Sequence, residues 1–209
     1  MRKLALSDEV LLSVEKPARY IGGEINMVKK DPSKVDIRFC MCFPDVYEIG
    51  MSHLGIQILY DMFNTREDIY CERVYSPWVD LDKIMREQKI PLFALESQDP
   101  IKEFDFLGIT LQYEMCYTNI LQVLDLSGIP LLAKDRTEED PIVIGGGPCS
   151  YNPEPIAEFF DLFLSFLLGA DHEKVEHYEK RYNHENAAHA AAGRLCSVEE
   201  DVVKHCISV

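Results

Sequence analysis

Three short stretches hold the residues whose types could do chemistry. They are PDVYEIGMSHLG (44–55), QYEMCYTN (112–119) and GGGPCSYNPEP (145–155). The first combines two carboxylates with a histidine, His53, which could line a site or only pack against the start of a helix. The glycines of the third let the backbone adopt positive φ and approach a ligand closely. A plain turn after a strand explains such a glycine run equally well.

None of the three stretches matches a catalytic motif. The sequence has no GxSxG elbow and no cysteine paired with a histidine at motif spacing. The glycine run lacks the later glycines of a dinucleotide fingerprint and the lysine of a phosphate-binding loop. Asp45 and Glu48 are equally suited to favour a helix start through its dipole. The pattern therefore favours a pocket for a planar or phosphorylated cofactor over catalysis by the protein alone.

Alternating strands and helices must position these stretches. Apolar runs predict five strands, at 35–43, 69–75, 91–97, 104–112 and 141–150. Helical spacing predicts helices at 6–14, 54–63, 77–89 and 116–126, and Ser52 could cap the second of them. Strands separated by helices of about ten residues pair in parallel. We therefore expect an α/β, doubly wound, mainly parallel sheet, with the loops after residues 43, 112 and 144 meeting at one edge.

Composition excludes several classes of protein. The 209 residues are 47% hydrophobic and 27% charged, a balance that predicts a folded core. The net charge of −15 disfavours nucleic-acid binding. The longest apolar stretch, 159–169, is interrupted by Asp161 and is too short for a membrane helix, so we expect no membrane partner. The start has no signal-peptide pattern and the seven cysteines are scattered, which predicts a cytoplasmic protein with reduced thiols.

The chain divides into three regions by composition. Residues 1–34 form a polar lead-in, and residues 35–163 form the α/β domain. Residues 164–209 hold five of the six histidines and a patch NAAHAAAG. This tail has helical propensity but little apolar periodicity, so we expect it to be helical or loosely ordered and unrelated to the domain.

Longer strings resemble a known family. KPARYIGGEINMVKKD, FPDVYEIGMSHLGIQILYDMFN, ERVYSPW, FDFLGITLQYEMCYTNIL and IVIGGGPCSYNPEPIAEFFDLF span about residues 16–163. Together they resemble the amino-terminal part of a group of uncharacterised bacterial radical SAM proteins, in which a cobalamin-binding-like domain precedes the radical SAM barrel. The resemblance implies a flavodoxin-like domain that holds cobalamin at the strand ends. In the full-length family, the barrel carries a 4Fe-4S cluster and S-adenosylmethionine.

The resemblance also assigns candidate cofactor contacts. The cobalamin motif DxHxxG corresponds to the residues 45–50, where Tyr47 stands in place of the cobalt-binding histidine. A phenol is a poorer cobalt ligand than an imidazole, so any bound cobalamin should lack a protein imidazole. The GGGP string resembles the turn along the cofactor's nucleotide tail. The candidate cofactor-binding residues are Asp45, Tyr47, Gly50, Ser52, His53, Thr110, Gln112, Tyr113, Glu114, Gly145, Gly146 and Gly147.

The chain departs from the family pattern after Phe163. No CxxxCxxC motif occurs, so we expect this chain alone to be inactive and to assemble no cluster. A truncated or frame-shifted product, or a split subunit, would explain the departure. The leading interpretation is a cobalamin-binding-like domain without catalytic machinery. The alternative is a cofactor-free flavodoxin-like docking domain for a radical SAM barrel supplied in trans.

Overall fold

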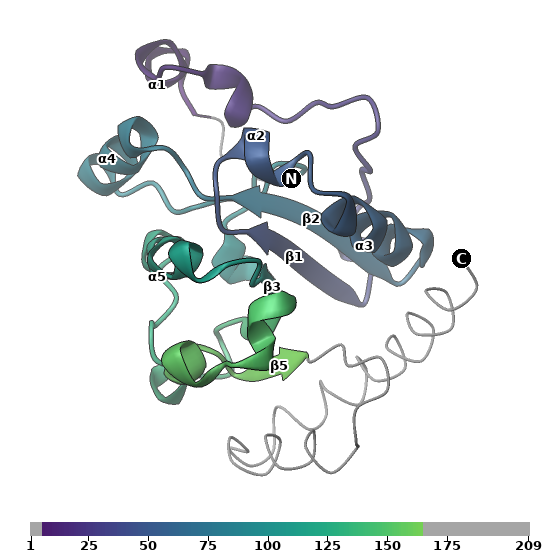
Figure 1. Cartoon of the computed structure of the whole chain (residues 1–209). Coiled ribbons are helices and arrows are strands. Elements are labelled where there is room, and N and C mark those ends of the chain that lie inside the picture. The colour runs from purple at the N-terminus through teal and green to yellow at the C-terminus, as the bar shows by residue number, and fades with distance from the viewer. Residues whose placement is uncertain (1–5, 165–209) are drawn as a thin grey trace. The chain divides into compact units, whose positions relative to one another are not determined.

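A parallel sheet of five strands organises the domain (Figure 1). The computed structural model describes residues 6–164 of the chain. The strand order is β2-β1-β3-β4-β5 and every neighbouring pair is parallel. The strands are β1 (Ile37–Phe43), β2 (Ile69–Tyr75), β3 (Phe106–Thr110), β4 (Ile142–Gly146) and β5 (Leu162–Leu164). This order is that of flavodoxin-like folds, so the predicted fold class is confirmed.

Helices cover both faces of the sheet, as a doubly wound fold requires (Figure 1). The α-helices are α1 (Asp8–Ser13), α2 (Tyr47–Gly50), α3 (Leu54–Thr65), α4 (Val79–Gln88) and α5 (Tyr117–Leu126). Buried side chains of α1, α4 and α5 pack with Cys40 and Cys42 in one hydrophobic core. On the opposite face, Phe63 of α3 stacks on Phe39, with 4.7 Å between the ring centroids. No helix within residues 6–164 is long and apolar enough to cross a membrane.

Short 3-10 helices connect these elements. They are η1 (Pro17–Arg19), η2 (Pro32–Lys34), η3 (Ile101–Glu103), η4 (Glu114–Cys116), η5 (Ala133–Asp135), η6 (Pro148–Tyr151) and η7 (Glu154–Phe159). The predicted helices at 6–14, 54–63, 77–89 and 116–126 are confirmed by α1, α3, α4 and α5. The predicted tail, from residue 165 onward, lies outside the described residues.

The predicted strand at 91–97 is wrong. The backbone N–H of Leu95 donates to the Arg73 carbonyl of β2 (2.9 Å), but no ladder continues from this bond. The Glu96 carboxylate instead accepts the next free N–H of β2, that of Arg73, at 2.7 Å. The chain then turns back through Gln98, whose φ is +62°. The Glu96 side chain thus replaces the backbone carbonyl that a neighbouring strand would offer to Arg73. The fifth strand of the sheet is β5, not the segment 91–97.

The lead-in crosses the outer edge of β2 and is bonded to β2, α3 and α4, and also to α2 through Glu48 and Tyr47. Glu24 forms an ion pair with Arg73 of β2 (2.5 Å), and the backbone N–H of Val28 donates to the Tyr60 hydroxyl of α3 (2.9 Å). Near its start, the backbone N–H of Glu15 donates to Asp80 of α4 (2.8 Å). These bonds place the lead-in beside the carboxyl end of β2.

Candidate functional site

The candidate site is the carboxyl edge of the sheet at the junction of β1 and β3. In the order β2-β1-β3, the connections from β1 and β3 leave toward opposite faces, and ligands bind such folds at this point. The register places Cys42 beside Ile109, and Ile109 beside Gly145. The loops that follow β1, β3 and β4 therefore lie at the same edge, as predicted.

Hydrogen bonds join the two loops across this junction. The Tyr113 hydroxyl donates to Asp45 Oδ2, and the Asn119 amide donates to the Pro44 carbonyl (3.0 Å). The backbone N–H of Ser76 donates to the Asp45 carbonyl (3.0 Å), which adds the end of β2. The bond to Asp45, followed by burial, raises the pKa of Tyr113 to about 12, so the phenol stays a donor at neutral pH. Asp45 thus connects three strand ends.

Tyr47 lies away from this junction. Its hydroxyl donates to Glu24 of the lead-in, and its ring contacts the Tyr75 ring edge-on at 5.4 Å. Burial, followed by the bond to Glu24, raises the pKa of Tyr47 to about 12. Gly50 follows on α2, where an added Cβ would lie 2.3 Å from the Tyr75 ring. Both residues pack α2 against the end of β2.

His53 caps helix α3. Its Nδ1 accepts the backbone N–H of Ile56 at 3.3 Å, and its ring packs against Phe43 at 5.2 Å. The prediction that Ser52 is the cap is wrong, because its hydroxyl donates back to the Ile49 carbonyl (2.9 Å). His53 therefore packs at the start of the helix, which is one of the two roles that its sequence position allowed.

We expect the His53→Ala variant to lose about 1 kcal/mol of folding stability, because the N–H of Ile56 loses its acceptor. His53→Asn should lose less, since asparagine is a good capping residue. Urea unfolding followed by circular dichroism would measure both. Equal losses in the two variants would contradict a capping role.

The remaining candidate residues lie at the ends of β3 and β4. Thr110 donates to the Cys42 carbonyl (2.9 Å), which ties β3 to β1. Gln112 is half-buried, and Glu114 is exposed on η4. Both belong to the loop that meets Asp45.

The three glycines serve the packing of the strands. A Cβ on Gly145 would lie 2.9 Å from the Phe163 ring. Gly147 has a φ of +115°, and a Cβ there would lie 3.0 Å from the Leu111 carbonyl oxygen. Gly146 has more room, since its nearest neighbour, Leu164, would be 3.8 Å away. Gly145 therefore makes room for Phe163 of β5, and Gly147 lets the turn approach the end of β3, so two of the three positions need glycine.

These contacts do not fit cobalamin seated as the DxHxxG motif would seat it. Tyr47 points to the lead-in, and the Nδ1 lone pair of His53 is engaged by α3. At Gly145, which is buried, the Phe163 ring occupies the space that a Cβ would need, whereas Gly147 is exposed. Within residues 6–164, no group of three or more His, Cys, Asp or Glu side chains could hold a metal ion.

Exposed apolar side chains at this edge were not among the candidates from sequence. Four of them, which we call the carboxyl-edge patch, come from the connections after four different strands: Leu54 after β1, Trp78 after β2, Met115 after β3 and Tyr151 after β4. Met115 is 88% exposed and Tyr151 is 77% exposed. Large apolar side chains beside predicted strand ends could have signalled this patch. Arg19 of the lead-in, which also reaches this edge, had no such signal.

The strand order defines the class of protein as a flavodoxin-like α/β domain, and the candidate site lies at the carboxyl ends of its strands. Residues 55–199 match the family model described as the N-terminal region of radical SAM proteins, and the chain belongs to this family. The match begins in α3, after the loop that holds Asp45 and Tyr47, and it ends beyond the described residues.

One curated relative is an uncharacterized protein, MJ0966, of Methanocaldococcus jannaschii. It is 30% identical to this chain over 125 residues, which are 58% of this chain and 22% of the relative. The chain thus spans about a fifth of the length of this relative. No solved structure matches the chain.

Proposed function

We propose that this domain docks on the radical SAM core of its protein through the carboxyl edge of the sheet. The observation that carries the proposal is the state of that edge: the junction is closed by bonds of Asp45, and large apolar side chains face outward around it. Exposed apolar side chains gathered in one region mark interaction surfaces. The domain supplies binding, and the chemistry belongs to the core.

The radical SAM core is the partner that the family and the topology support. The chain matches the amino-terminal region of radical SAM proteins, and its curated relative is several times longer than the matched segment. Leu164 pairs with Gly146 in register, so β5 ends at the carboxyl edge. The chain therefore continues from the edge that carries the carboxyl-edge patch.

Binding to the remainder of the Methanocaldococcus jannaschii relative, expressed as a separate chain, tests this proposal. Isothermal titration with wild type should give a 1:1 complex, and Met115→Glu combined with Tyr151→Glu should weaken it at least tenfold, because charged groups would be buried. Leu12→Glu, at an equally exposed apolar position on α1, is the matched control and should change binding less than twofold. The relative's own amino-terminal region serves as positive control.

Two outcomes contradict docking. One is a wild type that does not bind while the positive control does. The other is a double variant that binds as tightly as wild type. Self-association of the wild type that the double variant abolishes would assign the patch to a second copy instead.

Cobalamin binding is the second candidate function, favoured by the strand order and its junction between β1 and β3. Incubation of the full chain with hydroxocobalamin, followed by gel filtration, separates the two candidates. Docking without a cofactor predicts no retained cobalamin absorbance. If cobalamin is retained, wild type and His53→Ala should give the same spectrum, because no imidazole would bind cobalt.

A further inference from the structure

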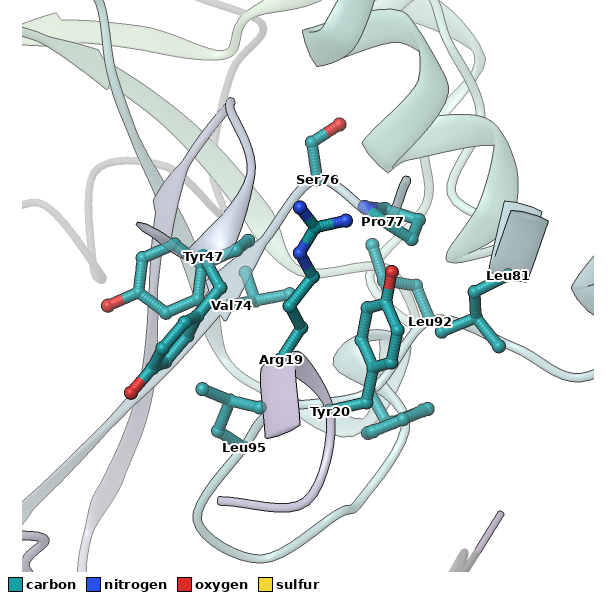
Figure 2. Close-up of a pocket in the computed structure, with 11 residues that line it drawn as sticks. Arg19, Tyr20, Tyr47, Val74, Ser76, Pro77, Leu81, Leu92 and Leu95 are labelled. Atoms are coloured by element: carbon teal, nitrogen blue, oxygen red, sulfur yellow. The ribbon is translucent and has the colours of Figure 1, made fainter. Parts of the chain in front are cut away.

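A small cavity lies at the carboxyl end of β2, under the lead-in (Figure 2). Its volume is about 20 Å³, enough for an atom group the size of one water molecule. Most of its wall is apolar or aromatic. The lining includes Arg19, Tyr20, Tyr47, Tyr75, Ser76 and Phe93.

Arg19 brings an unused hydrogen-bond donor to this cavity. Its side chain is only 9% exposed, and Figure 2 shows the guanidinium reaching between Tyr47 and Tyr20 toward Ser76. Nε and Nη2 donate to the Glu48 carboxylate at 2.9 to 3.1 Å. Nη1 is buried and makes no hydrogen bond of acceptable geometry, although the Tyr20 hydroxyl lies close enough to the guanidinium to raise the pKa of Arg19. A buried donor without an acceptor is costly, which points to a ligand atom at Nη1.

The other polar groups of the wall are mostly engaged. The Tyr20 hydroxyl accepts the backbone N–H of Trp78 at 3.2 Å, and the Ser76 hydroxyl donates to Gln122. Only the Tyr75 hydroxyl shares the condition of Arg19 Nη1, being buried without a partner. The lining therefore offers one cationic donor and one neutral hydroxyl.

The charged groups around the cavity are balanced, with Arg19 and Lys16 opposite the carboxylates of Glu48 and Asp80. Glu48 pairs with both Arg19 and Lys16 (3.0 Å), so two cations share one carboxylate. The bonds from Arg19 lower the pKa of Glu48 to about 2 and raise the pKa of Arg19, so both stay ionised at neutral pH. The nearby Asp80 carboxylate already accepts the backbone N–H groups of Glu15 and Leu81.

We propose that this cavity binds a carboxylate, presented by an aspartate or glutamate side chain of the docking partner. A carboxylate oxygen would accept from the free Nη1 donor, whereas a phosphate dianion would bury a second charge against the leucines and Phe93 without partners. The cavity admits one carboxylate oxygen, and the rest of the group remains outside it. The identity of the partner rests on the proposed docking function, but the carboxylate site stands on the cavity itself.

Trp78 makes this site directly measurable. It is the only tryptophan of the chain, and the Arg19 guanidinium carbon lies 5.6 Å from its ring centroid. Formate, the smallest carboxylate, should change the Trp78 fluorescence of the full chain along a saturable curve when titrated against chloride at constant ionic strength. Arg19→Lys keeps the charge but removes Nη1, and it should weaken the formate response at least tenfold. Arg86→Lys, at an exposed ion pair on α4, is the matched control and should respond as wild type.

Several results would overturn the carboxylate site. They are a wild type without a saturable response, an equal response in Arg19→Lys, and an equal response to chloride alone. If Arg19→Lys fails to fold, the test uses wild type alone, and the NMR resonance of the Trp78 indole N–H is followed during titration. The carboxylate site predicts that this resonance shifts with formate and does not shift with phosphate. Partner binding is measured without formate, so failure of docking and failure of the carboxylate site are distinguishable.

Discussion

At pH 8, where Glu96 is ionised, replacing Arg73 with methionine is expected to lower the free energy of unfolding by about 3 to 5 kcal/mol. Arg73 is 7% exposed in its side chain and pairs with Glu96 (2.7 Å) and Glu24 (2.5 Å). Its guanidinium also lies 4.5 Å from the Tyr60 ring centroid. Methionine retains much of the volume but leaves the buried Glu96 carboxylate without its cation. Urea unfolding followed by circular dichroism would measure the loss.

Arg86→Met is the matched control for this prediction. Arg86 also pairs with two carboxylates, Asp82 and Asp125, but its side chain is 47% exposed. Exposed ion pairs contribute little, so this variant should lose less than about 1 kcal/mol. Similar losses in the two variants would show that burial does not decide the strength of these pairs.

Stability is expected to fall by about 3 kcal/mol as the pH rises from about 4.5 to about 7. Burial raises the pKa of Glu96 from 4.5 to about 7, although Arg73 acts in the opposite direction. Arg73 only partly offsets the effect of burial on Glu96, because Arg73 is shared with Glu24. Burial also raises the pKa of the neighbouring Glu72. Between the two pKa values, the folded state holds a proton that the unfolded state releases. The contribution is complete below pH 4.5 and lost above pH 7.

Glu96→Gln should flatten the stability profile in this window, because glutamine carries no titrating proton. Free energies of unfolding from urea curves at half-unit pH steps would show the difference. Glu87→Gln, at an exposed position on α4, is the control and should keep the slope of wild type. A wild-type stability that rises from pH 4.5 to 7 would contradict the raised pKa.

The sequence was sufficient to predict most of the sheet because its buried strands are continuous apolar runs. In β1 and β2 nearly every residue is buried, which is typical of parallel strands covered on both faces. The segment 91–97 has similar composition, yet Glu96 bonds to β2 through its side chain and ends the ladder. β5 has three residues, too few for any pattern to reveal.

The site was predicted less completely than the fold. That Asp45 and Tyr113 meet follows from parallel pairing, because the carboxyl ends of adjacent strands share an edge. The direction of Tyr47 depends on Glu24, which is 23 residues earlier in the chain, in a segment without periodicity. The same holds for Arg19, whose partner Glu48 is 29 residues away. Long-range contacts of an irregular segment leave no local signal.

The outer edge of β2 cannot readily accept a further strand. Its outward backbone groups are occupied one by one: Lys30 donates to the Ile69 carbonyl (2.6 Å), and the Asn64 amide bonds both groups of Cys71 (2.9 and 3.1 Å). At Arg73, the carbonyl accepts the backbone N–H of Leu95, and the backbone N–H donates to the Glu96 carboxylate. An unpaired edge is a template for intermolecular strands and aggregation. Here that template is blocked by side chains, so within the described part of the molecule β5 is the edge at which a foreign strand could pair.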